Sequence, residues 1–141
     1  MPEIIPSPAD IVTRVFHSLK LGTDPGENGQ WPIFVNVEPN EPDDVITVQD
    51  TEGAMEGRLQ FPGTISEKPG IQIRIRSRNP NPSKPYQIRD AMDQTIRNNT
   101  VKVSGINYKL VSVSRQSNVI SIGRDGNNGL FLFVINAQVT L

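Results

Sequence analysis

Three arginines on one expected strand give the sequence its most distinctive binding chemistry. Isoleucines alternate with polar positions over residues 70–79, and Arg74, Arg76 and Arg78 all fall on the polar side. A period of two is typical of a strand whose two faces differ in polarity. A guanidinium group is a permanently charged, planar donor suited to carboxylate or phosphate. The sequence therefore predicts a strand with one face on the core and one face that binds anions.

Acidic residues that could pair with these arginines lie earlier in the chain. Up to residue 56 there are eleven acidic residues and two basic ones, and afterwards there are four acidic and twelve basic residues. The formal charges are −9 and +8, which give the net charge of −1. This division fits either two solvated faces or a polar molecule that pairs head to tail with its own copies. The candidate carboxylates are Glu38, Glu41, Asp43, Asp44, Asp50 and Glu52.

The inventory of catalytic residues is small. The chain has one histidine and no cysteine, so thiol chemistry, disulfides and Cys-ligated zinc are excluded. Any Ser-His system would depend on His17, which falls in an expected regular helix. Neither a nucleophile elbow nor a phosphate-binding Gly-Lys-Ser/Thr loop occurs. The acidic turn at 38–44 lacks the spacing of a calcium loop. We therefore expect no enzyme activity, no cofactor and no metal site.

The sequence also lacks the marks of a membrane or secreted protein. No apolar run approaches the roughly 20 residues that a membrane span needs. The first residues, Met-Pro-Glu-Ile-Ile-Pro, do not combine a basic region with an apolar one, as a secretory signal would. We expect no membrane partner and a location in the cytosol or in a particle assembled there.

The first half of the chain predicts one helix, two strands and long loops. Ser7 as N-cap, Pro8 at the first helical position and Gly22 as the stop favour a helix over residues 7–21. Strands are expected at 31–37 and 45–49, with antiparallel pairing between them as the expected arrangement. Residues 50–53 are expected to form a turn and residues 54–69 an irregular arm. The expected loops lie at about 22–30, 38–44, 50–69 and 79–84.

The second half predicts a helix followed by a β meander. Apolar residues at helical spacing favour a helix from about residue 84 or 85 to residue 98. Strands are expected at about 100–104, 107–115, 118–123 and 130–140. The last is apolar on both faces until Asn136, which fits a central strand or a subunit contact. The prediction is α+β: a single domain over 1–141, with a largely antiparallel twisted sheet and two main helices packed on it.

Nucleic-acid binding is a second interpretation of the basic residues that follow residue 56. Its aromatic residues are few among the basic ones, Tyr86 and Tyr108, so no platform for base stacking is evident. Loose phosphate contact, as in a pore through which DNA passes, stays open and would depend on salt.

The order of motifs resembles a known family. An amphipathic helix precedes Pro-Asp-Asp-Val-Ile-Thr-Val-Gln-Asp-Thr-Glu-Gly (42–53) and Pro-Gly-Ile-Gln-Ile-Arg-Ile-Arg-Ser-Arg (69–78), and a meander ends with Phe-Val-Ile-Asn-Ala (133–137). From about residue 7 to 140 the chain is similar to the minor capsid and tail-terminator-like proteins of the neck of long-tailed bacteriophages. It departs from their pattern at Glu52 and in the prolines Pro80 and Pro82.

The resemblance implies a structural virion protein. It implies a homohexameric ring that caps the head-proximal end of the tail tube and presents a surface to the head-side connector or stopper protein. The implied partners are further copies of the chain, the tail tube protein, that connector and the genomic DNA in the pore. The implied location is the tail or neck of the virion, after assembly in the host cytoplasm.

Two hypotheses for the arginines follow from combining the charges with the resemblance. A closed ring needs two different patches on each subunit. Arg74, Arg76 or Arg78 would then pair with a neighbour's carboxylates from residues 38–56. Alternatively, the same arginines line the pore and face DNA. The alternative function is a DNA-contacting head–tail adaptor or another nucleic-acid binding module.

Overall fold

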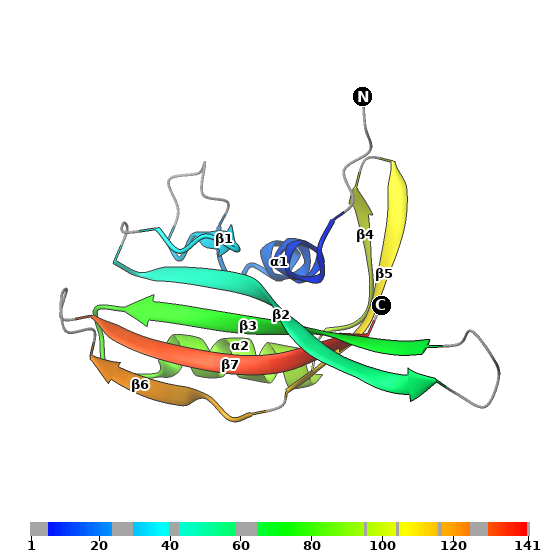
Figure 1. The fold of residues 1–141 in the computed structure, drawn as a ribbon. Coiled ribbons are helices and arrows are strands. Elements are labelled where there is room, and N and C mark those ends of the chain that lie inside the picture. The colour runs from blue at the N-terminus through cyan, green and yellow to red at the C-terminus, as the bar shows by residue number, and fades with distance from the viewer. Residues whose placement is uncertain are drawn as a thin grey trace.

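The structure is a computed structural model that describes residues 6–23, 30–39, 43–58, 65–94, 96–103, 105–115, 117–124 and 130–140. The elements are α1 (Pro8–Ser18), β1 (Ile33–Val35), β2 (Val45–Arg58), β3 (Ile65–Ser77), α2 (Ser83–Gln94), β4 (Arg97–Val103), β5 (Ile106–Arg115), β6 (Ile120–Arg124) and β7 (Phe131–Thr140) (Figure 1). The strands form a seven-stranded sheet in the order β1-β2-β3-β7-β5-β4, with β6 paired to β7 outside this path. The named strand pairs are antiparallel except β1 and β2. The predicted α+β class is confirmed.

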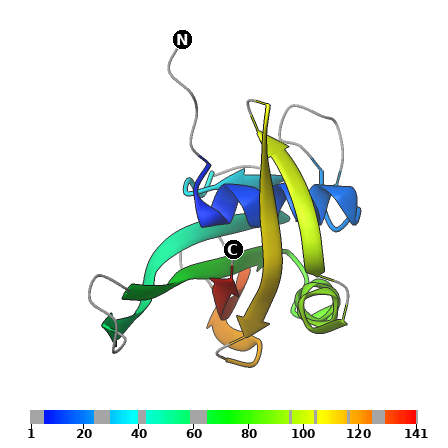
Figure 2. The same ribbon diagram turned by 90° about the vertical axis from the view of Figure 1, so that its right-hand side faces the viewer.

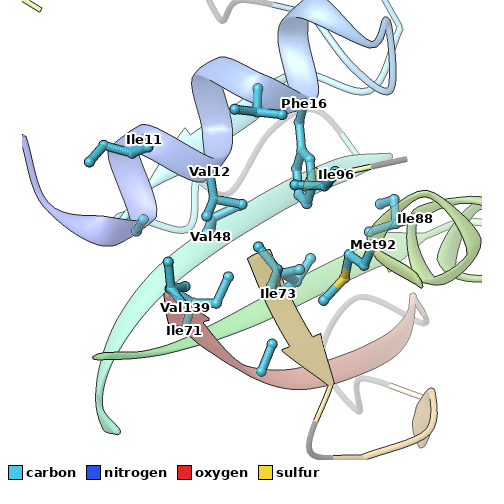
Figure 3. Close-up of a cluster of buried hydrophobic side chains, with 14 of the residues drawn as sticks. Ile11, Val12, Phe16, Val48, Ile71, Ile73, Ile88, Met92, Ile96 and Val139 are labelled. Carbon is cyan, nitrogen blue, oxygen red and sulfur yellow. The ribbon is translucent and has the colours of Figure 1, made fainter. Parts of the chain in front are cut away.

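Both helices pack on one face of the sheet. Ile71, Ile73 and Ile75 of β3, which alternate with polar residues, are at most 1% exposed. Val12 and Phe16 of α1 and Met92 of α2 belong to the same buried cluster as Ile71 and Ile73, as Figure 3 shows. Since alternate residues of a strand point to opposite faces, the face that carries Arg74 and Arg76 is the one without a helix.

Helix α1 begins where the sequence predicts and ends earlier. The Ser7 side chain caps the helix by accepting a hydrogen bond from Asp10 N at 3.3 Å. The helix ends at Ser18, and Lys20 takes a positive φ of 59° while Leu21 N donates to Phe16 O. This geometry ends the helix before Gly22, so the predicted end at residue 21 is wrong.

Gly22 is instead needed for a close approach. A Cβ at this position would lie 2.5 Å from the Ile33 side chain and 2.5 Å from Trp31 O. The absence of a side chain at residue 22 therefore lets the chain after α1 lie directly against the start of β1.

The largest difference from the sequence prediction is strand β2. It runs parallel to β1, with Ile33 opposite Ile46, so the expected antiparallel pairing is wrong. It also continues through the expected turn at 50–53 to Arg58, with register shifts after Thr51 and after Glu56. The expected irregular segment is therefore strand at 54–58 and 65–69, while its residues 59–64 lie outside the described part. Strands β2 and β3 therefore form a long hairpin that projects beyond the rest of the sheet (Figure 1).

The C-terminal elements follow the prediction with shifted boundaries. Helix α2 ends at Gln94, and the expected helical residues 97 and 98 begin β4. Asn98 has a φ of 53°, which a helix does not allow. Strand β7 is central, with β3 on one side and β5 and β6 on the other, as its apolar sequence indicates. Figure 2 shows that β4 and β5 form a hairpin at the end of the sheet and that this hairpin passes in front of α1.

Candidate assembly surface

The arginines of β3 lie on the sheet face without a helix, next to its β2 partners. Arg74 is opposite Thr47 and Arg76 is opposite Val45 in the antiparallel register. Thr47 and Val45 are fully buried, and Arg76 is 7% exposed. The expectation of an open arginine face therefore holds only in part, because Arg76 belongs to the buried residues.

Arg74 is incompletely bonded within the described part of the chain. Its Nη2 lies 3.5 Å from Glu38 Oε2 and its Nη1 lies 3.5 Å from Gln72 Oε1. Both distances are long for charge-assisted hydrogen bonds. Its Nε is buried and has no hydrogen-bond partner among the described residues, and neither does the Thr47 hydroxyl opposite it. The Arg74 guanidinium group can therefore bind a better-placed carboxylate or phosphate.

Arg76 and Arg78 both contact the acidic turn before β2. Arg76 Nε donates to Asp43 O at 3.4 Å. Arg78 binds Asp44 twice, through its backbone N at 3.0 Å and through Nη2 at 3.3 Å. The Arg78 side chain is 69% exposed. The structure thus brings all three arginines to acidic residues of their own chain, and pairing between subunits stays a prediction.

Asp50 has a role inside the subunit. Its Oδ1 accepts from Ala9 N at 2.9 Å, and its Oδ2 accepts from Asn36 Nδ2 at 2.8 Å. The carboxylate therefore ties the first turn of α1 and the end of β1 to β2. Glu41 lies outside the described residues, and nothing is described of the Glu52 side chain, although its backbone belongs to β2.

Arg115, which lies outside β3, forms a two-pronged ion pair with Asp93. Arg115 Nε and Nη2 lie 2.8 Å and 2.9 Å from the two oxygens of Asp93, and Nη1 donates to Ser117 O. The hydrogen bonds to Asp93 raise the pKa of Arg115 above its ordinary value. The pair lines a polar hollow of about 740 Å³ and joins α2 to β5. The donors of Arg115 and the acceptors of Asp93 are engaged within the chain, which favours a structural tether.

A smaller hollow of about 370 Å³ lies near the start of α2. Lys84 Nζ is 5.6 Å from the centre of the Trp31 ring, a cation–π distance. Burial lowers the pKa of Lys84 from its ordinary value. This contact connects α2 to the segment before β1.

Features of metal sites and membrane spans are absent from the part of the chain that the structure describes. Within it, no three His, Cys, Asp or Glu side chains gather in a way that would hold a metal ion. No helix among these residues has the length and apolar character to cross a membrane.

The structure brings Arg74 and Arg78 to two of the candidate carboxylates, Glu38 and Asp44, within one chain, and their role between subunits stays a prediction. Arg74 and Glu38 are 36 positions apart, and only the β2–β3 register brings them together. The Arg115–Asp93 tether joins a helix and a strand, for which spacing along the chain gives no signal. The alternation at 70–79 was the one local signal that located the face correctly.

The described part of the chain is thus an α+β unit with ion pairs on the sheet face without a helix. The chain belongs to the bacteriophage tail terminator protein family, whose model matches residues 16–141. It is therefore a structural component of a phage tail and of the virion. No curated protein shows a significant match to the chain.

Proposed function

We propose that the protein forms a closed ring at the head-proximal end of the tail tube, ends tube growth there and joins the tail to the head-side connector. The observation that carries the proposal is the incompletely bonded Arg74 on the sheet face without a helix, in a chain of the tail terminator family. Each unsatisfied buried donor costs about 1–3 kcal/mol, so a neighbour's carboxylate at this position would stabilise the assembly.

Weak pairs within the subunit fit such an exchange. The side chains of Arg74 and Glu38 are 25% and 27% exposed, and Arg78 is more exposed still. Ion pairs at solvent-accessible sites contribute about 0–1 kcal/mol. Replacing a partner from the same chain with one from a neighbouring subunit therefore has a small cost, and complementary charges suppress wrong pairings.

Charge reversal with mixing tests the exchange. Arg74→Glu places two glutamates together, and we expect loss of ring-sized species by size-exclusion chromatography with light scattering. Glu38→Arg should have the same effect. Mixing the two variants should restore the ring, because every contact between subunits joins opposite charges when the two variants alternate around it. Arg89→Glu is the matched control, since Arg89 pairs with Asp90 on helix α2, away from this sheet face.

The alternatives predict different results. If the Arg74–Glu38 pair acts only within one chain, the double variant with both substitutions regains the ring and the mixture does not. If Arg74 lines a pore and contacts DNA, Arg74→Gln leaves the ring intact but weakens DNA passage, with a salt dependence in binding assays. A wild-type protein that stays monomeric at high concentration, both alone and with tail tubes, would refute ring formation.

A further inference from the structure

The β2–β3 hairpin extends beyond all neighbouring strands. Strand β1 pairs with β2 only at residues 46–48, and β7 pairs with β3 only from Gly70 onward. Residues 51–58 and 65–69 thus form a two-stranded ribbon, here called the arm, with an unpaired edge on each side in the described chain. The eight residues of its β2 strand span about 26 Å at the usual rise.

A two-stranded ribbon of this length is unusual on its own. Isolated hairpins are marginally stable in water, and an unpaired strand edge is a template for another strand. The β2 edge of the arm is the longer one and contains no proline, whereas Pro69 removes a backbone donor from the β3 strand. The β2 edge, residues 51–58, is therefore the better acceptor for an added strand.

A suitable unpaired edge occurs on the same molecule, at β6. This strand pairs with β7 on one side and with no other strand among the described residues. Ile120 and Ile122 are 42% and 58% exposed. Natural edge strands are usually protected by lysine, proline, a bulge or a covering element. Strand β6 contains neither lysine nor proline, and its register shift lies between Ser121 and Gly123. Burial of such isoleucines against a partner would be favourable.

The other edge strands are better protected. Strand β1 has only three residues and is followed by Asn36, whose side chain binds the backbone of Asp50. Strand β4 is rich in polar residues and lies beside α1, with Lys102 and Arg14 around a hollow between them. The arm and β6 are thus the two edges best suited to strand addition.

These two edges lie at opposite ends of the sheet. Strand β6 pairs with the Phe131–Val134 half of β7, whereas the arm begins beyond Gln138, at the other end of that strand. Figure 1 shows β6 below β7 and the arm projecting to the right. The two edges of one molecule therefore do not meet, but those of two copies can meet head to tail.

From this geometry we infer that the β2 edge of the arm adds to strand β6 of a second copy of this chain. The arm strand carries Glu52, Glu56 and Arg58, and residues 117–124 carry Arg124, so the formal charges are −1 and +1. Register shifts leave residues 54–56 as the regular run of the arm, and this run is the part of the β2 edge best suited to pair with β6. The inference deepens the proposed ring and rests on it.

Engineered cysteines test the contact directly, because the chain has none of its own. One variant carries Ile120→Cys and a second carries Ala54→Cys or Met55→Cys, two positions that face opposite sides of the ribbon. Under mild oxidation the mixture should form a disulfide-linked dimer, and each variant alone should not. A chain with both cysteines should form a covalent ladder on a non-reducing gel, ending at the number of subunits in the ring.

A second measurement uses charge at the edge. Ile120→Lys with Ile122→Lys should weaken self-association by roughly tenfold or more, since two apolar contacts are lost and a lysine opposes strand addition. Ile106→Lys is the matched control, because Ile106 is 38% exposed and lies at the start of β5. Circular dichroism and thermal unfolding should show all variants folded.

Each other outcome overturns the inference in a recognisable way. Cross-linking of the Ile120→Cys variant alone would show that β6 pairs with β6. Rings of normal size without any cross-link, and without an effect of the lysines, would refute the arm contact and leave the ring proposal standing. A protein that never associates would refute both.

Discussion

The hydrogen bonds of Asp50 and Asn36 give a stringent test of the structure. Asp50 accepts from Ala9 N and from Asn36 Nδ2, and its own N donates to Asn36 Oδ1. Residue 50 must therefore offer two acceptors, whereas residue 36 must offer one donor and one acceptor. Asp50→Asn breaks this pattern, because either orientation of the new amide places a donor against a donor.

The expected magnitude follows from the groups involved. A hydrogen bond to a charged group contributes about 1.5–3 kcal/mol, and a negative charge near a helix N-terminus adds about 0.3–1 kcal/mol. Because Asn36 is exposed, the lower end applies, and Asp50→Asn should lower the free energy of unfolding by about 1–2 kcal/mol. Asn36→Asp should cost at least as much, since it places two carboxylates in contact.

The double exchange should recover most of this loss. With Asn at 50 and Asp at 36, every hydrogen bond can re-form: Ala9 N and the backbone N of residue 50 still donate, and only the bond between the two side chains reverses its direction. Asp also tolerates the positive φ of 60° at residue 36. We expect the double variant within about 1 kcal/mol of the wild type, the remainder reflecting the charge moved away from α1.

Urea unfolding followed by far-UV circular dichroism measures this double-mutant cycle. Each kcal/mol should also correspond to about 3–4 °C in Tm for a chain of this size. A double variant as unstable as the sum of the single variants would refute the assigned hydrogen bonds.

Three further predictions concern the core and the helix tethers. Phe16→Ala, at a fully buried site, should cost about 3–5 kcal/mol in urea unfolding, and a loss below 1 kcal/mol would contradict the observed packing. Arg115→Met should cost about 1–2 kcal/mol by calorimetry, because its pair with Asp93 is partly exposed, and Asp93→Asn should add little to it. The pKa of Lys84 is lowered on folding, so the folded chain binds fewer protons and stability should rise as pH increases toward 10.5. Lys84→Met should lack that rise in pH-dependent thermal melts, and identical pH profiles would contradict the burial of the Lys84 ammonium group.

Local signals predicted the elements whose ends and faces are set by neighbouring residues. The Ser7 cap and the alternation of Ile71, Ile73 and Ile75 both appear in the structure as the sequence indicates. The apolar character of β7 on both faces correctly indicated a central strand. These features depend on contacts within a turn of helix or on the two-residue period of a strand.

The sequence predicts a turn at 50–53 and an irregular segment at 54–69 where the structure has the strands of the arm, because these residues resemble a loop. Gly53 and Gly57 lie in β2 and Pro69 lies in β3, although glycine and proline usually mark turns. Register shifts near the two glycines accommodate them within the strand. The parallel pairing of β1 and β2 also depends on tertiary contacts, since a short apolar strand carries no signal for its direction.

Strand β3 joins the two surfaces on which the proposals rest. It begins in the arm, passes through the core at Ile71, Ile73 and Ile75, and ends beside Arg76 and Arg78. A slip by one residue would turn its isoleucines out of the core, so the register is fixed. The angle between the two surfaces is therefore set by the twist of one continuous strand. In the proposed ring, where the arm meets β6 of the next subunit, this twist sets the direction in which the arm leaves the subunit, and substitutions that alter it should change the ring's diameter without touching either contact.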